Sequence, residues 1–330
     1  MTVSLDGSPQ GKLVTVFGGS GFVGRHVVRA LARRGFRVRA AVRRPDLAGV
    51  LQPAGNPGQV VAVQANIRRE HRWSVERAVE GADAVVNLVG VLAPSGKQTF
   101  DDVIADGAHM VAEATRAAGI DRLVQISAIG ADDDSTSAYS RAKARAESTA
   151  LTLLPKSVVL RPSVIFGPDD GFFNLLAFIA SLSPVLPLIG GGANRLQPVF
   201  VRDVAEAVAV AVEGGAKPGG IYELGGPEVK TFRQCAEAVL EATHRKRFLV
   251  PWPAGLARFQ AKYFFELLPN PLLTTEQVDL LKLDNVVSDA AIAEGRTFAG
   301  LGIEPTALSA ELDAYLWRFR SRGQFDRRPA

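Results

Sequence analysis

The sequence Gly18-Gly19-Ser20-Gly21-Phe22-Val23-Gly24 directly follows an apolar run at residues 13–17 and opens a segment with helical periodicity. Its glycines at 18, 21 and 24 form a GxxGxxG turn between a predicted strand and a predicted helix. Glycines let the chain turn sharply, let the backbone approach a pyrophosphate and let the helix pack closely on the strand, while the helix N-terminus attracts phosphate. The alternative is a glycine-rich loop without a ligand. We predict that residues 18–24 bind a dinucleotide.

Beyond this turn, short apolar runs alternate with longer helical patterns, which is typical of βαβ units around a parallel sheet. Strands are predicted at residues 13–17, 37–42, 60–64, 84–88, 122–126, 158–160 and 221–224, and helices at residues 22–34, 75–80, 100–118, 138–153 and 203–213. The pattern predicts an α/β fold with a doubly wound (Rossmann) parallel sheet. We expect a dinucleotide-binding domain at residues 12–168 and 198–228, and a smaller, mostly helical C-terminal domain at residues 169–197 and 229–330.

The residues after the second predicted strand indicate which dinucleotide binds. NAD-specific proteins place a carboxylate there to bind the ribose 2′-hydroxyl, but this strand ends in Val42-Arg43-Arg44-Pro45. Two guanidiniums can instead hold a 2′-phosphate through charge-assisted hydrogen bonds. The sequence therefore favours NADPH over NADH, with Arg43 and Arg44 as ligands of the 2′-phosphate. The alternative is that both arginines are merely solvated.

A tyrosine and a lysine lie four residues apart in the predicted helix at residues 138–153. Tyr139 and Lys143 therefore share one helix face. Ser127 adds a hydroxyl just after the fifth predicted strand, at the end of the sheet where open α/β folds bind ligands. A nearby ammonium makes the ionised phenol accessible, and a second hydroxyl can polarise a carbonyl that receives hydride. The three residues indicate a proton-transfer site; the alternative is a surface tyrosine with a neighbouring lysine.

In their order along the chain, these motifs resemble those of the short-chain dehydrogenase/reductase superfamily, in its extended and atypical branches. The shared motifs are the glycine turn, Asn87-Leu88-Val89-Gly90, Ser127, the Tyr139/Lys143 pair and residues 161–168 (RPSVIFGP). The resemblance implies a catalytic triad of Ser127, Tyr139 and Lys143, in which Lys143 also holds the nicotinamide ribose. It further implies cofactor contacts at Asn66, Ile67, Leu88, Val89, Gly90, Pro162, Ser163 and Val164. The sequence departs from the family pattern at Asn66, where aspartate is common, and in the short interval between Ser127 and Tyr139.

A narrower resemblance covers nearly the whole chain. Residues 86–90, 161–174, 197–204 and 273–288 are similar to segments of the NAD(P)-binding accessory subunits of respiratory complex I and their bacterial relatives. That family implies bound NADPH, a mainly structural role and a position beside the membrane, and related proteins are associated with ubiquinone biosynthesis. The resemblance thus implies an accessory or assembly factor of complex I or of quinone metabolism. Open alternatives are an active NADPH-dependent reductase or dehydrogenase on a hydrophobic carbonyl or quinone-like substrate, and a nucleotide-sugar epimerase or dehydratase.

Composition argues against several other classes of protein. The single cysteine, Cys235, excludes an internal disulfide, and the scattered histidines lack the paired spacing of a zinc site, so no metal is expected. Lys and Arg exceed Asp and Glu by only 38 to 34, without interleaved aromatics, which argues against nucleic-acid binding. Residues 1–10 lack the features of a signal or transit peptide. This predicts a cytoplasmic protein, with a peripheral position on the cytoplasmic face of the inner membrane as the alternative.

Two apolar stretches fall in the predicted second domain. Residues 172–189 approach the length of a membrane span, but polar residues and prolines interrupt them, so we predict a buried or interfacial helix followed by a turn. A second stretch has helical spacing with two cations beside the apolar face: Trp252, Leu256, Phe259, Tyr263 and Leu267, flanked by Arg258 and Lys262. This face either docks on an acidic membrane surface or partner, or packs into the domain's own core.

Overall fold

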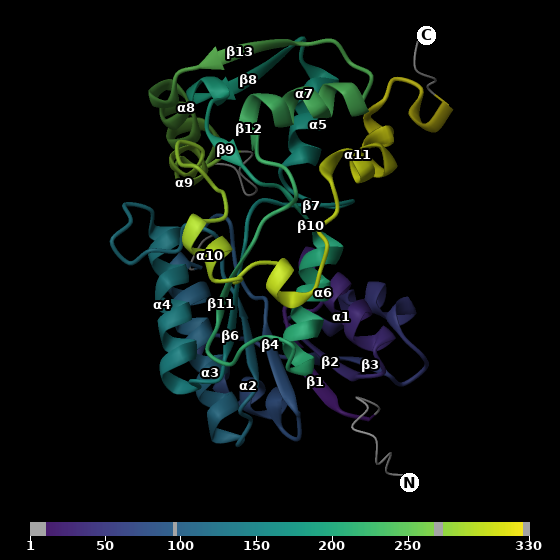
Figure 1. The fold of residues 1–330 in the computed structure, drawn as a ribbon, viewed down its shortest axis with the longest axis vertical. Helices are drawn as coiled ribbons and strands as arrows, with labels where there is room; N and C mark the ends of the chain where they lie inside the picture. The colour runs from purple at the N-terminus through teal and green to yellow at the C-terminus, as the bar shows by residue number, and fades with distance from the viewer. Residues whose placement is uncertain (1–10, 95–97, 267–272, 326–330) are drawn as a thin grey trace. The chain divides into compact units, whose positions relative to one another are not determined.

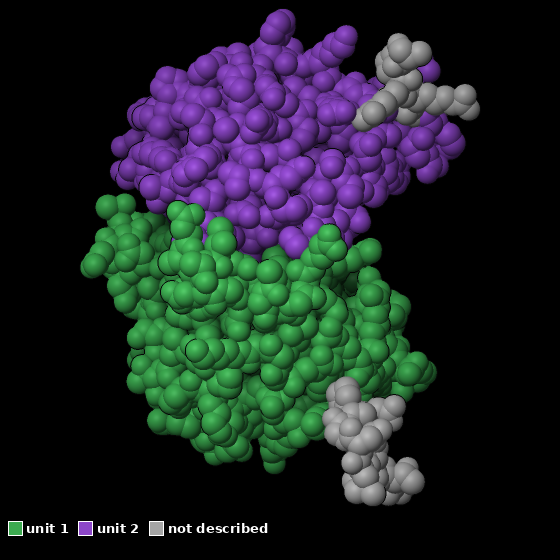
Figure 2. Space-filling view, in the orientation of Figure 1, with its two compact units in different colours: residues 1–161, 202–223, 289–304 green, residues 162–201, 224–288, 305–330 purple. Residues whose placement is uncertain are grey.

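The computed structural model describes residues 11–94, 98–266 and 273–325. The chain forms two compact units, drawn in green and purple in Figure 2. The first unit consists of Met1–Arg161, Arg202–Glu223 and Asp289–Glu304, and the second of Pro162–Val201, Leu224–Ser288 and Pro305–Ala330. The segment at residues 289–304 thus returns to the first unit after the chain has passed through the second.

The first unit is built on a seven-stranded sheet with the strand order β11-β6-β5-β4-β1-β2-β3. These strands are β1 (Leu13–Phe17), β2 (Arg37–Val42), β3 (Val60–Gln64), β4 (Ala84–Asn87), β5 (Leu123–Ile126), β6 (Val158–Pro162) and β11 (Ile221–Leu224). The pairs from β3 through β6 are parallel. The strand order reverses between β1 and β4, which is the place where open α/β sheets bind ligands. The predicted doubly wound α/β fold is confirmed.

Helices cover both faces of this sheet, which explains why its strands are apolar on both sides. The helices that the first unit contains before residue 289 are α1 (Phe22–Arg33), α2 (Arg72–Val79), α3 (Asp106–Ala117), α4 (Ala138–Leu153) and α6 (Val201–Glu213). One core cluster joins α2, α3 and α4 to strand residues such as Val85 and Leu123. On the opposite face, Arg34 after α1 forms ion pairs with Glu206 and Glu213 of α6, and Figure 1 shows α1 beside α6.

The second unit combines helices with short two-stranded sheets. Its helices are α5 (Phe173–Leu182), α7 (Phe232–Ala242), α8 (Ala254–Gln260), α9 (Thr275–Leu280) and α11 (Leu308–Leu316), and its strand pairs are β7 (Ile165–Phe166) with β10 (Val199–Phe200), β9 (Arg195–Leu196) with β12 (Lys230–Thr231), and β8 (Val185–Ile189) with β13 (Phe248–Trp252). The buried carboxylate of Asp170 organises the start of α5 by accepting from the N–H groups of residues 172–174. Its other oxygen accepts from the Tyr315 hydroxyl at 2.8 Å, which ties α11 to this corner.

The structure confirms the predicted helix within residues 172–189 and corrects the rest of the two predictions for the apolar stretches of the second unit. Residues 172–189 form α5 followed by the strand β8, where a helix and a turn were expected. Trp252 lies in β13, opposite Ile189, and not on the predicted helix. Pro253 favours an extended Trp252, because the residue before a proline is disfavoured in the helical region. The helix begins at Ala254, and Leu267 lies outside the described residues.

The remaining face of α8 and the turn after it is exposed. Leu256, Phe259 and Tyr263 are 43%, 54% and 53% exposed, so they do not pack into the unit's core. Arg258 forms an ion pair with Asp279, and the Lys262 ammonium lies 5.5 Å from the ring centre of Tyr263. In the part of the chain that the structure describes, no helix is both long and apolar enough to span a membrane.

Candidate dinucleotide-binding site

The glycine turn between β1 and α1 forms a cradle that side chains cannot enter. Gly18 has a φ of +78°, and its N–H donates to Ala41 O of β2 at 3.0 Å. A Cβ on Gly24 would lie 2.2 Å from Gly18 O, and one on Gly19 would lie 2.9 Å from the Ala40 Cβ. The turn therefore needs glycine for its conformation at Gly18 and for close packing at Gly24.

The cradle ends at the N-terminus of α1. Gly21 is the N-cap, and no side chain caps the helix, so the first-turn N–H groups keep their capacity to bind an anion. A Cβ on Gly18 would meet Leu88 C at 3.4 Å and Val89 N at 3.5 Å, which places the end of β4 beside the turn. The predicted residues Leu88 and Val89 therefore adjoin the glycine turn, at the reversal point of the sheet. This arrangement fits a pyrophosphate.

The two predicted 2′-phosphate ligands follow β2 and differ in their surroundings. The Arg44 guanidinium is exposed and forms a close ion pair with Asp46, with a shortest distance of 2.7 Å. That pairing raises the pKa of Arg44. Among the described residues, Arg43 makes a single long contact, from Nη1 to Gln98 Oε1 at 3.4 Å. Arg43 is thus the less engaged of the two guanidiniums, whereas Arg44 would have to exchange Asp46 for a phosphate.

The predicted adenine contacts follow β3. Asn66 is held in place because its N–H donates to Ser74 Oγ at 3.1 Å and its Oδ1 accepts from Arg68 N at 3.2 Å. Ile67 is buried, and its side chain fills the space above Gly107 of α3, where a Cβ would lie 2.4 Å from Ile67 Cδ1. Asn66 therefore has a fixed backbone and keeps its side-chain amide N–H groups for a ligand.

Lys143 joins the helix α4 to the ends of β4 and β5. Its Nζ donates to Ile126 O at 3.3 Å, lies 5.7 Å from the ring centre of Tyr139, and would be 3.5 Å from a Cβ on Gly90. Tyr139 in turn packs edge-on against Phe100, with ring centres 5.8 Å apart. The structure thus brings Lys143, Tyr139, Gly90 and the residue before Ser127 together; of these, sequence spacing predicts only that Tyr139 and Lys143 share a helix face.

The hydroxyl of Ser127 is buried and has no hydrogen-bond partner in the part of the chain that the structure describes. Its N–H donates to Leu160 O at 2.8 Å, which fixes its backbone between β5 and β6. Its Oγ is buried and makes no hydrogen bond to any described residue. Because buried hydroxyls are nearly always hydrogen-bonded, an unpaired one indicates a missing ligand or water. The orphaned hydroxyl and the side-chain-free cradle both fit a bound dinucleotide with its substrate end near Ser127.

Burial shifts the pKa of both titratable residues of the site. It lowers the pKa of Lys143 to about 8, an effect that the neighbouring Glu147 opposes. It raises the pKa of Tyr139 to about 12. Both shifts disfavour the charged form, as expected for groups taken out of water. Without a ligand, therefore, the phenol holds its proton at neutral pH, while Lys143 can titrate within the physiological range.

Behind Lys143 lies a buried charge cluster that sequence reasoning missed. Glu147, one turn further along α4, is buried and accepts two hydrogen bonds from Arg161 of β6, at 2.9 and 2.6 Å. Arg161 also approaches the carboxylate of Glu223 in β11 to 3.8 Å. Only the i,i+4 spacing of Lys143 and Glu147 is visible in the sequence. The cluster supplies negative charge near the lysine and links α4 to two strands.

The predicted nicotinamide-pocket residues Pro162, Ser163 and Val164 belong to the second unit. Ser163 Oγ donates to Asn285, whose backbone and side-chain oxygens lie at 2.9 and 2.6 Å. Asn285 also pairs with the 195–197 segment, because its N–H donates to Arg195 O at 2.8 Å and its O accepts from Gln197 N at 3.1 Å. The segments at residues 161–174, 197–204 and 273–288 therefore meet around Asn285, a residue that sequence reasoning did not single out.

Comparisons with known proteins agree with this geometry. Residues 18–156 match the NAD(P)H-binding family model. The chain is 33% identical to the mitochondrial NADH dehydrogenase [ubiquinone] 1 alpha subcomplex subunit 9 of Arabidopsis thaliana, over 96% of this chain and 80% of that protein. It is also 33% identical to the ceramide reductase of Caulobacter vibrioides, over 58% of each chain. Among solved structures, the NADPH-dependent quinone oxidoreductase of Escherichia coli shares the fold, with a TM-score of 0.71, 17% identity and coverage of 91% and 99%.

Proposed function

The chain belongs to the family of subunit 9 of the alpha subcomplex of NADH dehydrogenase [ubiquinone], and from this premise we propose that it is an NADPH-binding accessory or assembly factor of respiratory complex I or of quinone metabolism. The glycine cradle carries this proposal, because a Cβ on Gly24 would lie 2.2 Å from Gly18 O and the helix behind it has no side-chain cap. Such a cradle binds a pyrophosphate through backbone N–H groups. Bound NADPH then stabilises the fold.

Each part of the cofactor has its own residues in this proposal. The turn at residues 18–24 holds the pyrophosphate, Arg43 and Arg44 hold the 2′-phosphate, and Asn66 and Ile67 contact the adenine. Lys143 holds the nicotinamide ribose, and residues 162–164 line the nicotinamide pocket. Leu88, Val89 and Gly90 contact the cofactor between its pyrophosphate and this ribose. When bound, the cofactor supplies a hydride for two-electron reduction.

The preference for NADPH is tested by two single substitutions. We expect Arg43→Ala to weaken NADPH binding by tenfold or more, since a charge-assisted hydrogen bond contributes about 1.5–3 kcal/mol. NADH binding should change by less than about threefold, because NADH has no 2′-phosphate. Arg44→Ala should have a smaller effect than Arg43→Ala, because Asp46 already engages that guanidinium. Isothermal titration calorimetry measures the six affinities of the natural chain and the two variants for NADPH and NADH, and equal losses for the two cofactors would contradict the assignment.

The accessory role is tested by locating the chain in its native membranes. Gently solubilised source membranes are separated on a native gel, and the chain is identified by mass spectrometry. Comigration with complex I or with a quinone-biosynthetic assembly is the expected result. A chain found only as a free protein would overturn the accessory role and favour an independent reductase.

We further propose a peripheral position on the cytoplasmic face of the inner membrane. The exposed face of Leu256, Phe259 and Tyr263, with Lys262 beside it, has the aromatic and cationic character of an interfacial anchor. We expect the purified chain to float with anionic liposomes in a salt-sensitive manner. Phe259→Ser should reduce flotation, whereas Phe325→Ser, at another exposed phenylalanine, should not. Absence of flotation on anionic lipid would contradict this contact.

A second candidate function is catalytic reduction of a hydrophobic carbonyl or quinone-like substrate. The buried Ser127 hydroxyl favours it, because it has no hydrogen-bond partner among the described residues and can donate to a substrate oxygen. In this function Ser127 Oγ donates to the substrate oxygen, Tyr139 transfers its phenolic proton to that oxygen, and the Lys143 ammonium lowers the pKa of the phenol. Substrate-dependent NADPH oxidation that disappears in Tyr139→Phe, while NADPH binding survives, would establish this reaction. Turnover unchanged by Tyr139→Phe would exclude Tyr139 as the proton donor.

A further inference from the structure

The two edge strands of the large sheet differ in whether another segment covers their outer side. At the β11 edge, the 289–304 segment covers the strand: Glu223 N donates to Arg296 O at 2.9 Å, and Arg296 Nη1 donates to Ile221 O at 2.7 Å. At the β3 edge, no strand of the described residues pairs on the outer side. The sequence of β3, Val-Val-Ala-Val-Gln, also lacks the lysine or proline that usually protects a free edge.

The hydrogen-bond pattern shows which backbone groups of β3 are free. Val38 N donates to Gln59 O at 2.8 Å, and Ala65 N donates to Val42 O at 2.9 Å. Along a parallel strand, the N–H and C=O groups of successive residues point to opposite sides. The backbone groups of the odd-numbered residues of β3 therefore point toward β2. The N–H and C=O groups of Val60, Ala62 and Gln64 therefore face outward, and none has a partner among the described residues. They can pair with the backbone of an extended chain.

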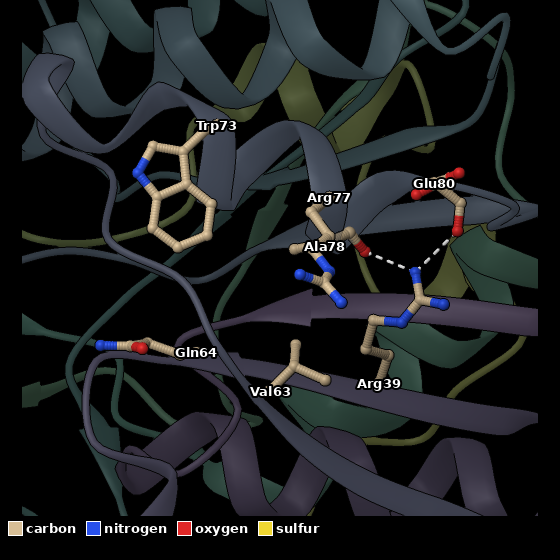
Figure 3. Close-up of a pocket in the computed structure, with 7 residues that line it drawn as sticks. All are labelled: Arg39, Val63, Gln64, Trp73, Arg77, Ala78 and Glu80. Carbon is tan, nitrogen blue, oxygen red and sulfur yellow. Dashed lines mark hydrogen bonds between the residues drawn. The ribbon is translucent and has the colours of Figure 1, made fainter.

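A cavity of about 480 Å³ lies along this edge, between α2 and the strands β2 and β3. Figure 3 shows Trp73 and Arg77 on the helix side, with Val63 and Arg39 on the strand side. Trp73 is 58% exposed. Val61, which lies on the same face of β3 as Val63, is 52% exposed. A chain added to β3 would place alternate side chains in this cavity, where they would cover apolar surface that is otherwise in water.

The charges of the cavity indicate the chemistry of those side chains. The Arg39 guanidinium is already engaged, because it donates to Ala78 O and Glu80 O at 2.7 Å each (Figure 3). Arg77 forms no hydrogen bond or ion pair with any residue that the structure describes. A carboxylate is the side chain that pairs with a free guanidinium in two parallel hydrogen bonds. With two arginines against Glu80, the cavity favours an acidic group over a basic one.

We propose that the β3 edge and this cavity form a docking site for an extended segment of a partner protein, which adds a strand to β3, places apolar side chains against Val61, Val63 and Trp73, and pairs an aspartate or glutamate with Arg77. Main-chain pairing supplies much of the affinity in such a complex, and the pocket supplies the specificity. None of the residues that line this cavity belongs to the glycine turn.

The test is a selection of displayed random decapeptides on the full chain, with counter-selection on Ala62→Pro. The proline removes one outward N–H of β3 and keeps the pairing with β2, which runs through the odd-numbered residues. We expect enriched peptides that alternate apolar residues and carry Asp or Glu at a fixed position. Their synthetic forms should lose at least tenfold in affinity to Arg77→Ala and to Ala62→Pro. Exchange of the peptide carboxylate for an amide should have a similar effect.

The matched control is Arg116→Ala, which removes an exposed arginine from the last turn of α3, as Arg77→Ala does from the last turn of α2. Arg116→Ala should leave peptide affinity unchanged, and all variants should keep their thermal unfolding and NADPH binding. Enrichment no better than on Ala62→Pro, or enrichment without a carboxylate, would overturn the proposal. Self-association that Ala62→Pro abolishes would assign the edge to a second copy of the chain. Binding only by a chain that starts at Gly11 would assign it to residues 1–10, and either result also overturns the proposal.

Discussion

Lys143 is the residue whose charge should control cofactor affinity near neutral pH. Burial lowers its pKa to about 8, so the ammonium is present below that pH and is lost as the pH rises through it. Because the proposed ribose contact uses N–H donors of a charged group, NADPH binding should weaken several-fold between pH 7 and pH 9.5. Lys143→Met should bind more weakly at pH 7 and show a flatter pH profile by calorimetry. Lys156→Met, at an exposed lysine paired with Asp121, is the control, and an unchanged slope in Lys143→Met would refute this role.

Glu147 is the residue whose loss should cost the most stability near the site. Its carboxylate is buried and accepts both hydrogen bonds of Arg161, so Glu147→Ala leaves a partly buried guanidinium without its main partner. Breaking a buried ion pair from one side costs about 3–5 kcal/mol. Urea unfolding should show a loss of this order. Glu76→Ala, in an exposed pair with Arg72, should change the unfolding free energy by about 0.5 kcal/mol or less, and a similarly small loss for Glu147→Ala would contradict the argument.

The contrast between these two residues shows what could be predicted at this scale. Tyr139 and Lys143 share a helix face through local spacing, and the structure places their side chains together. The pairing of Glu147 with Arg161 depends on how α4 packs against β6, which no local pattern encodes. Ser127 was expected at the end of a strand, but its unpaired hydroxyl becomes visible only when every neighbour is in place.

Among the elements, the strands of the large sheet were the most predictable. The bounds of β1, β2, β3 and β11 agree with the sequence, because short apolar runs that end in turn residues are typical of strands both inside this sheet and at its two edges. The strand β13 was missed. Its pairing with β8 joins residues 248–252 to residues 185–189, and the helical spacing of Trp252 with Leu256 and Phe259 concealed that long-range pairing.

The turn between β1 and α1 should tolerate no side chain at Gly24. Gly24→Ala places a Cβ 2.2 Å from Gly18 O and 2.7 Å from Gly19 C, so the turn or the helix must move. We expect a loss of about 1–3 kcal/mol in unfolding free energy from overpacking and a loss of NADPH affinity of at least tenfold. Gly49→Ala is the control, because a Cβ there meets nothing within 4 Å and its φ is not positive. NADPH affinity that survives Gly24→Ala would show that the cradle does not hold the pyrophosphate.

For the whole molecule, the division of the chain depends on contacts that no linear pattern reveals. Residues 289–304 follow the second unit in sequence but belong to the first, because Arg296 pairs with Ile221 and Glu223 of the β11 edge. The resemblance of separated segments to one family could be recognised from the sequence. The similarity to subunit 9 of Arabidopsis thaliana extends over 96% of the chain. How those segments meet around Asn285 required the structure.

A cofactor that mainly stabilises the fold should act on the unfolding of the whole molecule. A ligand at 100 times its dissociation constant adds about 2.7 kcal/mol to a folded state that alone binds it. For a unit of roughly 150–250 residues this corresponds to a rise of roughly 5–10 °C in Tm. We therefore expect calorimetric Tm to rise with the logarithm of NADPH concentration, to rise less with NADH at equal concentration, and to stay constant in Gly24→Ala. If NADPH raises the Tm of Gly24→Ala as much as that of the natural chain, the cofactor binds elsewhere. If NADPH raises the Tm of neither protein, the cofactor does not stabilise the fold. An exchangeable cofactor in a catalytic cycle then becomes the better explanation for the same residues.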